Sequence, residues 1–285
     1  MLPLLPDFLA TFSLGKLCVA LSADGIALVQ QTAGFKKNVR HQQHVKLNSS
    51  VAQPKWQSAI SELDGLFSQL KLSKNTPVTI VLSSDFVRYL MLPAQPIAMS
   101  YAEKTAYANA AFHEVYGMAV NDWHIKCHDA APHESTIAVA VDAQLITALN
   151  QLAVKYQLKL NSVQPYVMAA FNSLIKQTAQ TNGYLVLTEN SKLLLLQLQK
   201  GACQQLRTVA ISHAEDGDWQ ADLNRAIQRE LVLNDNLPEA NKQLLIYAPA
   251  QKNQTLNKLD GWQTKRVGRN SLLSDARYAM LEVVL

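Results

Sequence analysis

The stretch Gly15-Lys-Leu-Cys-Val-Ala-Leu-Ser-Ala-Asp-Gly-Ile-Ala-Leu-Val-Gln30 predicts two antiparallel strands joined by a tight turn. Lys16 to Leu21 form the first strand and Ile26 to Gln30 the return strand. Asp24-Gly25 marks the turn, because a two-residue turn of the primed type needs positive φ, which glycine adopts without steric cost. The turn therefore accounts for Asp24, and we interpret its carboxylate as structural rather than as a general base or metal ligand.

The elements that follow this hairpin indicate a mixed α/β unit. A basic stretch from Phe35 to Leu47 predicts a third strand at the sheet edge, where lysines discourage further pairing. A helix is expected from Trp56 to Leu70, because apolar residues recur there at three- and four-residue spacing. The β-branched run Val78 to Leu82 suits a buried strand.

A second segment of the same type begins at Gly183, with Gly183-Tyr-Leu-Val-Leu-Thr-Glu-Asn-Ser-Lys-Leu-Leu-Leu-Leu-Gln197. It again opens a series of strand, hairpin, strand, strand, helix and strand, in which the third strand covers Gln204 to Ile211. The helix covers Trp219 to Leu233 and the last strand Gln243 to Tyr247. The shared order predicts an α/β fold built from a duplicated ribonuclease-H-like unit.

An inserted α+β module is predicted at about residues 85–141, within the first half. Its elements are a strand from Phe86 to Leu92, a helix from Tyr101 to Tyr116 and strands at Trp123 to Cys127 and Thr136 to Val141. We therefore expect a first half at residues 1–180 that contains this module, and a second half at residues 183–285. The polar run between them, residues 178–183, is the best linker candidate.

Composition excludes several classes of protein. The chain has 285 residues, of which 48% are hydrophobic and 17% charged, which is typical of globular proteins. The net charge of +4 is spread along the chain and demands no nucleic-acid partner. Three separated cysteines and the lack of a secretory signal favour a cytoplasmic protein. No Gly-x-Gly, P-loop, His-Glu-x-x-His or Cys-x-x-Cys motif occurs, so the common enzyme and cofactor signatures are missing.

Three pieces of sequence resemble one family. They are Val87-Arg-Tyr-Leu-Met-Leu-Pro93 with the helix start Ser100-Tyr-Ala-Glu103, then Ile137-Ala-Val-Ala-Val-Asp142, and finally Leu158-Lys-Leu-Asn-Ser-Val-Gln-Pro-Tyr166. In this order they resemble the PilM/MshI branch of the actin-like proteins, which serves type IV pilus biogenesis. The cytoplasmic part of GspL in type II secretion is a relative of this branch. The first hairpin looks especially like the MshI form of the MSHA pilus.

The resemblance also implies where a nucleotide would bind. In nucleotide-binding members each hairpin begins Asp-x-Gly, with the Asp serving metal and water and the Gly letting backbone amides approach phosphate. The matching positions here are Ala20 and Ser22 in the first hairpin, and Leu187 and Glu189 in the second. The adenosine-side loop, residues 248–250, is Ala-Pro-Ala and lacks glycines. We therefore expect no nucleotide, no other cofactor and no catalytic residues.

The resemblance further implies a partner. In PilM-like proteins a groove between the first subdomain and the inserted module receives the cytoplasmic tail of a bitopic membrane protein, PilN. The candidate groove residues are Phe86, Arg88, Tyr89, Leu90, Tyr101 and Tyr107. For the apolar ones, ordinary core packing is the alternative. The expected function is a non-enzymatic scaffold at the cytoplasmic face of the inner membrane, and the alternative is an actin-like ATPase or a sugar-kinase-like phosphotransferase.

Two further patterns leave alternatives open. His124, Cys127 and His128, with His133 nearby, could suggest a metal site, but strand alternation places Cys127 on the face of Trp123 and Ile125, opposite both histidines. We predict an ordinary strand and no metal. The basic residues of the predicted edge strand could contact anionic lipid or lie on a solvated edge, and a peripheral protein using this edge is a third function. These residues are Lys36, Lys37, Arg40 and Lys46.

Overall fold

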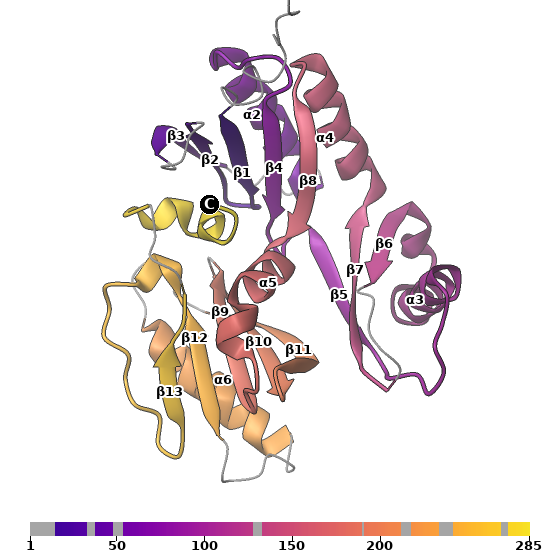
Figure 1. Ribbon diagram of the computed structural model, residues 1–285, viewed down its shortest axis with the longest axis vertical. Coiled ribbons are helices and arrows are strands. Elements are labelled where there is room, and N and C mark those ends of the chain that lie inside the picture. The colour runs from indigo at the N-terminus through magenta and orange to yellow at the C-terminus, as the bar shows by residue number, and fades with distance from the viewer. Residues whose placement is uncertain are drawn as a thin grey trace, which may run out of the picture. The chain divides into compact units, whose positions relative to one another are not determined.

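The computed structural model describes residues 15–32, 38–47, 54–127, 133–189, 191–211, 218–233, 242–268 and 273–285 (Figure 1). These residues fall into two compact units. The first takes its residues from Met1–Val87, Val141–Ala169 and Ser271–Leu285, and the second from Arg88–Ala140 and Ala170–Asn270. Each unit contains one five-stranded sheet.

The first sheet has the strand order β3-β2-β1-β4-β8. Its strands are β1 (Lys16–Leu21), β2 (Gly25–Gln31), β3 (Val39–Lys46), β4 (Pro77–Leu82) and β8 (Lys159–Pro165). β2 pairs antiparallel with both β1 and β3, whereas β4 pairs parallel with β1 and with β8. The predicted hairpin is confirmed, and β3 lies at the sheet edge as predicted. Arg40 and Lys46 are exposed on β3, whereas Lys36 and Lys37 lie outside the described residues.

Burial on both faces explains why β1 reads as a continuous apolar run. Leu17, Cys18, Val19 and Leu21 are all fully buried, although neighbouring side chains on a strand point to opposite faces. Helices α2 (Lys55–Gln69) and α4 (Ala143–Lys155) pack against each other beside this sheet. A sheet covered on both sides needs no polar alternation.

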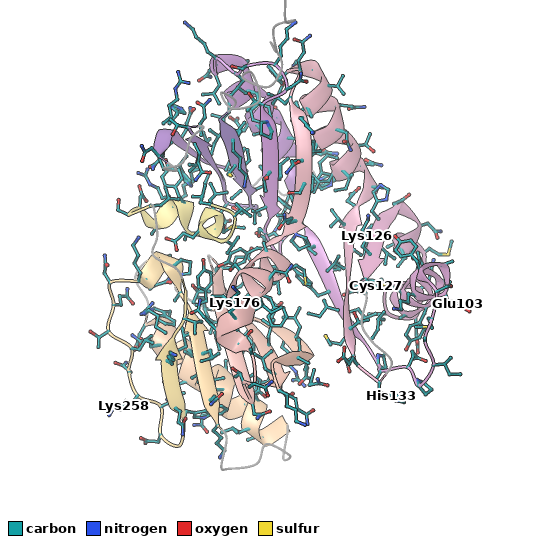
Figure 2. All side chains as sticks on the ribbon, viewed as in Figure 1. Glu103, Lys126, Cys127, His133, Lys176 and Lys258 are labelled. Carbon is teal, nitrogen blue, oxygen red and sulfur yellow. The ribbon has the colours of Figure 1, made fainter. Side chains whose placement is uncertain are left out.

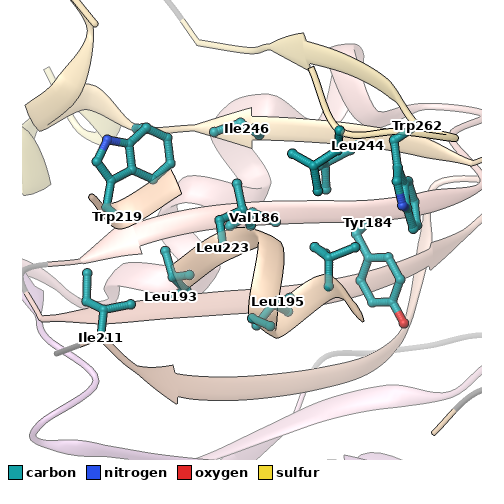
Figure 3. Close-up of a cluster of buried hydrophobic side chains, with 14 residues drawn as sticks. Tyr184, Val186, Leu193, Leu195, Ile211, Trp219, Leu223, Leu244, Ile246 and Trp262 are labelled. Carbon is teal, nitrogen blue, oxygen red and sulfur yellow. The ribbon is translucent and has the colours of Figure 1, made fainter. Parts of the chain in front are cut away.

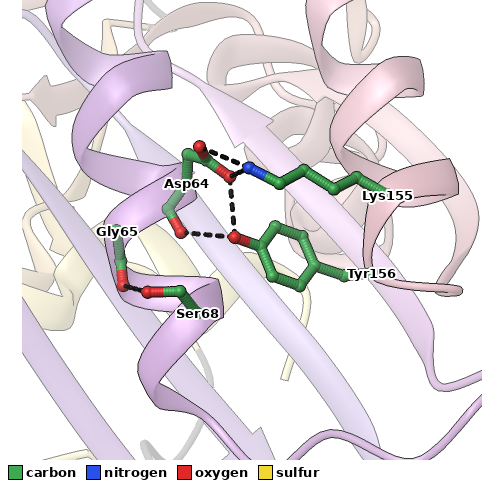
Figure 4. A network of polar contacts seen from close by, with 5 residues as sticks. All are labelled: Asp64, Gly65, Ser68, Lys155 and Tyr156. Atoms are coloured by element: carbon green, nitrogen blue, oxygen red, sulfur yellow. Dashed lines mark hydrogen bonds and ion pairs between the residues drawn. The ribbon is translucent and has the colours of Figure 1, made fainter.

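A polar network joins α2 to the end of α4 (Figure 4). Lys155 Nζ lies 2.7 Å from both carboxylate oxygens of Asp64, and the Tyr156 hydroxyl donates to Asp64 Oδ1 at 2.7 Å. These hydrogen bonds lower the pKa of Asp64, and the one from Lys155 has the largest effect. The Tyr156 ring also meets Phe67 edge-on, with centroids 5.6 Å apart. The network joins two neighbouring helices and is partly exposed to solvent, so we assign it a structural role.

The C-terminal 3-10 helix η4 (Ala276–Val283) packs on the first sheet and belongs to the first unit. It contacts β1 and β2, and Leu281 is fully buried. Tyr278 meets His44 of β3 edge-on, and Lys16 Nζ donates to the carbonyl oxygen of Val284 at 2.9 Å. The prediction had placed all of residues 183–285 in the second half. The last residues return to the first unit because their apolar side chains are buried there.

The second sheet repeats the first, with the strand order β11-β10-β9-β12-β13. Its strands are β9 (Gly183–Glu189), β10 (Lys192–Gln199), β11 (Ala202–Ala210), β12 (Gln243–Tyr247) and β13 (Gln263–Arg266). β10 is antiparallel to β9 and β11, whereas β12 is parallel to β9 and β13. Two sheets of equal strand order and equal pairing directions confirm the predicted duplication of a ribonuclease-H-like unit.

Helix α6 (Trp219–Leu233) covers one face of the second sheet. The core between them includes Tyr184 and Trp262 at one end and Trp219 at the other, with aliphatic side chains of the sheet and helix between (Figure 3). In the first sheet, helix α4 precedes β8 in the chain and so leads into the last parallel strand. In the second sheet, the single-turn η3 (Pro249–Gln251) and an extended loop connect β12 to β13.

Both sheets begin with a glycine for the same steric reason. A Cβ atom on Gly15 would lie 2.2 Å from the carbonyl oxygen of Gln31, and one on Gly183 would lie 2.0 Å from that of Gln243. Neither position can accept a side chain unless the backbone shifts. The predicted linker, residues 178–183, ends at this second glycine; Thr178 and Thr181 are nearly fully buried, whereas Ala179 and Gln180 are exposed.

The inserted module has a three-stranded sheet of order β5-β7-β6. Its elements are β5 (Val87–Leu92), α3 (Tyr101–Tyr116), the 3-10 helix η1 (Gly117–Asp122), β6 (Trp123–Cys127) and β7 (Thr136–Asp142). The helix begins with a capping box in which Glu103 N donates to Ser100 Oγ and Ser100 N donates to the Glu103 carboxylate. Helix α5 (Tyr166–Thr178) follows β8 later in the chain.

Candidate functional site

The turn between β1 and β2 is closed by a serine side chain. Ser22 N donates to the Gly25 carbonyl at 3.0 Å, Ser22 Oγ donates to the same oxygen at 2.9 Å, and Gly25 N donates to Ser22 Oγ at 3.0 Å. Ser22 and Ala20 stand at the positions that a phosphate-binding member would give to Gly and Asp. Both are buried. The backbone groups of this turn are therefore largely satisfied by the turn itself.

Gly25 is required for a different reason than the sequence suggested. Neither Asp24 nor Gly25 has a positive φ, so the predicted primed turn is wrong. Instead, a Cβ on Gly25 would lie 2.8 Å from the carbonyl oxygen of Val45 on β3. Asp24 holds the same strand end through its backbone, because its carbonyl accepts from Leu47 N at 2.8 Å. The Asp24 side chain is exposed.

A polar segment directly after β4 reaches the same turn. Asp85 Oδ2 accepts from Ala23 N at 3.2 Å and from Ser83 Oγ at 2.9 Å. Ser83 N in turn donates to the Leu21 carbonyl at 2.8 Å. Sequence reasoning missed this contact. The available signal was Ser83-Ser-Asp85 at the carboxyl end of a strand, since parallel neighbours such as β1 and β4 end at the same edge of a sheet.

The end of strand β9, which leads into the corresponding turn of the second sheet, is buried. Leu187 is fully buried and lies opposite Leu194 on β10 and Tyr247 on β12. Glu189 is only 2% exposed. Thr188 Oγ1 donates to the side-chain oxygen of Gln251 at 3.1 Å, which ties the end of β9 to η3. A leucine cannot bind a metal ion, and the Glu189 side chain stands at the position that a phosphate-binding member would give to glycine.

The loop after β12 is held by an arginine. Arg266 donates to the carbonyl oxygens of Ala248 at 3.2 Å and of Gln254 at 2.8 Å, and burial lowers the pKa of its guanidinium group. Trp219 Nε1 donates to the side-chain oxygen of Gln254 at 2.5 Å. Arg266 and Trp219 thus already bond to the carbonyl oxygen of Ala248 and to the backbone and side-chain oxygens of Gln254.

The six candidate groove residues have different environments. Leu90 and Tyr107 come together against the core of the inserted module, which is formed by residues of β5, α3, η1 and β7. Tyr89 is half-buried and alternates with Leu90 along β5, so it belongs to the other face of the small sheet. Phe86 is buried in the first unit. Arg88 is exposed, and Tyr101 at the start of α3 is 74% exposed.

The predicted alternation of β6 is confirmed. Cys127 packs with Trp123 and Ile125 against the module core, and His124 is exposed. Figure 2 labels Cys127 and its neighbour Lys126 on this strand. His128 lies outside the described residues. Across the described parts of the chain, no group of three His, Cys, Asp or Glu side chains is placed to hold a metal ion. No helix in the same ranges has the length and apolar character needed to cross a bilayer.

Two ribonuclease-H-like sheets, with an α+β insertion between β4 and α4 in the chain, define an actin-like fold. The prediction assigned this insertion to the first half, but Arg88–Ala140 group with the second compact unit. No protein-family model matches the sequence, and no curated protein matches it significantly. Solved structures do match. The PilM-PilN type IV pilus biogenesis complex is similar over 89% of this chain and 88% of that chain, with a TM-score of 0.61 and 12% identity.

Two other solved structures are similar over most of their length. The cytoplasmic domain of EpsL, an inner-membrane component of the type II secretion system of Vibrio cholerae, has a TM-score of 0.57 and 13% identity, covering 94% of both chains. A Bacteroides thetaiotaomicron protein with an actin-like ATPase fold and unknown function has a TM-score of 0.56 and 11% identity. That match covers 86% of this chain and 84% of the other. These similarities establish the fold.

Proposed function

We propose that the protein is a non-enzymatic assembly scaffold of a type IV pilus, of the MSHA type, or of a type II secretion machine. The observation that carries this proposal is the whole-length similarity to the PilM-PilN complex and to the EpsL cytoplasmic domain. The scaffold works in the cytoplasm, at the inner face of the inner membrane, by holding the cytoplasmic tail of a PilN-like bitopic protein.

The two hairpin turns support a role without nucleotide. An actin-like ATPase needs a carboxylate at each turn to position metal and water, and this chain has Ala20 and Leu187 there. Glu189 also places a buried side chain at the position that a phosphate-binding member gives to glycine. The alternative is an ATPase or a sugar-kinase-like phosphotransferase. Only the fold supports it, through the similarity to a protein that is described as having an actin-like ATPase fold.

The inserted module offers side chains suited to capturing a peptide. Arg88 on β5 and Tyr101 on α3 are exposed, and Arg and Tyr are enriched among the residues that dominate binding energy at interfaces. Tyr107 is a poorer candidate than the sequence suggested, because its ring packs against the module core. Strand addition or burial of a few anchor side chains are the two modes open to a short tail.

Isothermal titration and peptide capture test this proposal together. The intact protein should show no saturable heat with Mg-ATP, and it should bind a synthetic PilN-like cytoplasmic tail. Arg88→Ala and Tyr101→Ala should each weaken that binding about thirtyfold, a loss of about 2 kcal/mol. Lys126→Ala is a matched control, because Lys126 is an exposed residue of the same module. Micromolar binding of Mg-ATP, or variants that bind the tail as tightly as wild type, would contradict the proposal.

A further inference from the structure

A carboxylate from a distant part of the chain lies on the backbone of the first turn. Ala23 N donates to Asp85 Oδ2 at 3.2 Å, although 62 residues separate the two. The Ser83 hydroxyl donates to the same oxygen at 2.9 Å. One carboxylate oxygen thus receives a backbone amide of a tight turn and a hydroxyl group, which is how turns bind the oxygens of phosphate and related anions.

The position of the carboxylate is fixed by short-range contacts. Asp85 N donates to Ser83 Oγ at 3.0 Å, so the serine hydroxyl accepts from the backbone and donates to the side chain of the same residue. Ser83 is itself anchored to β1, because Ser83 N donates to the Leu21 carbonyl. Ser83 is 1% exposed, and Asp85 is half-buried. These contacts fix the Asp85 carboxylate at the turn, so its hydrogen bond to Ala23 N costs little side-chain entropy.

We propose that the turn at residues 22–25 is an anion site whose resident anion is the carboxylate of Asp85. Removing that carboxylate would open the site to an oxyanion of the phosphate class. This inference deepens the proposed function and rests on it, because in a scaffold that binds no nucleotide the Asp85 carboxylate can stay on the Ala23 amide. The hydrogen bond between Ala23 and Asp85 then connects the first hairpin to the residues just before β5, the strand that enters the module. This connection needs no ligand.

Charge explains why the site excludes free anions in the intact protein. A phosphate approaching Ala23 N meets the Asp85 carboxylate that already occupies the amide, and the exposed side chain of Asp24 lies in the same turn. Both carboxylates repel an anion. Only Asp85 bonds to the amide, so removing Asp85 should open the site, whereas removing Asp24 should not.

Nuclear magnetic resonance of the full chain with inorganic phosphate as the probe tests this assignment. In Asp85→Ala the Ala23 amide proton should move upfield, because it loses a charged acceptor. Added phosphate should then return it downfield, with an affinity at least about tenfold higher than for the wild type. Asp24→Ala removes a charge from the same turn but leaves Asp85 on the Ala23 amide, so added phosphate should not shift that amide appreciably.

Two further measurements keep the assignment testable if Asp85→Ala does not fold. In the wild type, the Ala23 amide should follow the titration of the Asp85 carboxyl group. In Asp85→Asn, which keeps the acceptor oxygen but not the charge, the same amide should be independent of pH in that range. A folded Asp85→Ala that ignores phosphate, or a wild-type Ala23 amide that ignores pH, would overturn the assignment. The Mg-ATP titration tests the proposed function separately, since it needs no variant of Asp85.

Discussion

The two sheets share one strand order but differ in chemistry at their first turn. In the first sheet, the turn is polar, and its groups bond to Ser22 and to Asp85. In the second sheet, the equivalent strand end is buried, with Leu187 fully enclosed and Glu189 nearly so. The topology is the same in both. The comparison teaches that an actin-like fold specifies where a ligand would bind, whereas the residues at the two turns decide whether it can.

The largest expected effect comes from returning an aspartate to the second turn. Leu187→Asp would place a carboxylate in a fully buried position between Leu194 and Tyr247. We expect a loss of about 4 kcal/mol in the free energy of unfolding, because an unpaired buried charge is among the most destabilising changes. Urea unfolding measures it. Leu187→Met, which conserves volume, should cost about 1 kcal/mol or less. A stable Leu187→Asp protein would show that this turn is more open than its burial indicates.

A second experiment tests whether the two units unfold independently, by truncating one buried leucine in a helix of each unit. Leu281 of η4 is fully buried against the first sheet, and Leu223 of α6 is buried in the core of the second. Leu281→Ala and Leu223→Ala should each cost about 3 kcal/mol, because each leaves a cavity. The urea midpoint, followed on amide resonances of β2 and of β10, should fall mainly for β2 in the first variant and mainly for β10 in the second. Equal shifts at both strands in both variants would show that the units unfold as one.

The smallest effect concerns pH and is confined to the first unit. Burial is the main cause that lowers the pKa of His44. The positive charges of Arg277 and Lys46 lower this pKa further, whereas the negative charge of Asp275 raises it. The folded state therefore favours neutral His44, which contacts Tyr278. Because the unfolded chain accepts the proton more readily, the first unit should lose stability as the pH falls below 6.5.

The same urea midpoints measure this pH effect. Between about pH 7 and pH 5 the β2 midpoint should fall relative to the β10 midpoint, and His44→Gln should reduce the difference. Asp24→Asn is a useful control, because it alters an exposed charge near the same strands without touching the ring of His44. An identical pH dependence in wild type and His44→Gln would assign the effect to other groups.

Local patterns predicted most of the elements. The helix Tyr101–Tyr116 has the expected ends, because Ser100 and Glu103 form a capping box and Gly117 takes a positive φ at its end. The strand β6 also has the expected bounds, and its alternation correctly separated Cys127 from His124. Signals of this kind depend on residues a few positions apart, which a sequence displays directly.

The candidate site was predicted less completely. The apolar character of position 187 and the lack of Asp-x-Gly were visible in the sequence, but Asp85 was not connected to the turn. The groove candidates Leu90 and Tyr107 were chosen for residue type, and the structure places both against the module core. Residue type alone does not distinguish an interface anchor from a core side chain, because both are large and apolar.

The sequence by itself determined the order of strands and helices, the duplication, and the lack of Asp-x-Gly in both hairpins. Only the tertiary structure decided that Asp85 bonds to Ala23, that η4 packs on the first sheet, and that Gly25 is needed for the approach of β3 rather than for a positive φ. The physical reason is range. Periodicity and capping act between near neighbours, whereas a side chain chooses a partner 62 residues away only after the sheet has brought the two strand ends together.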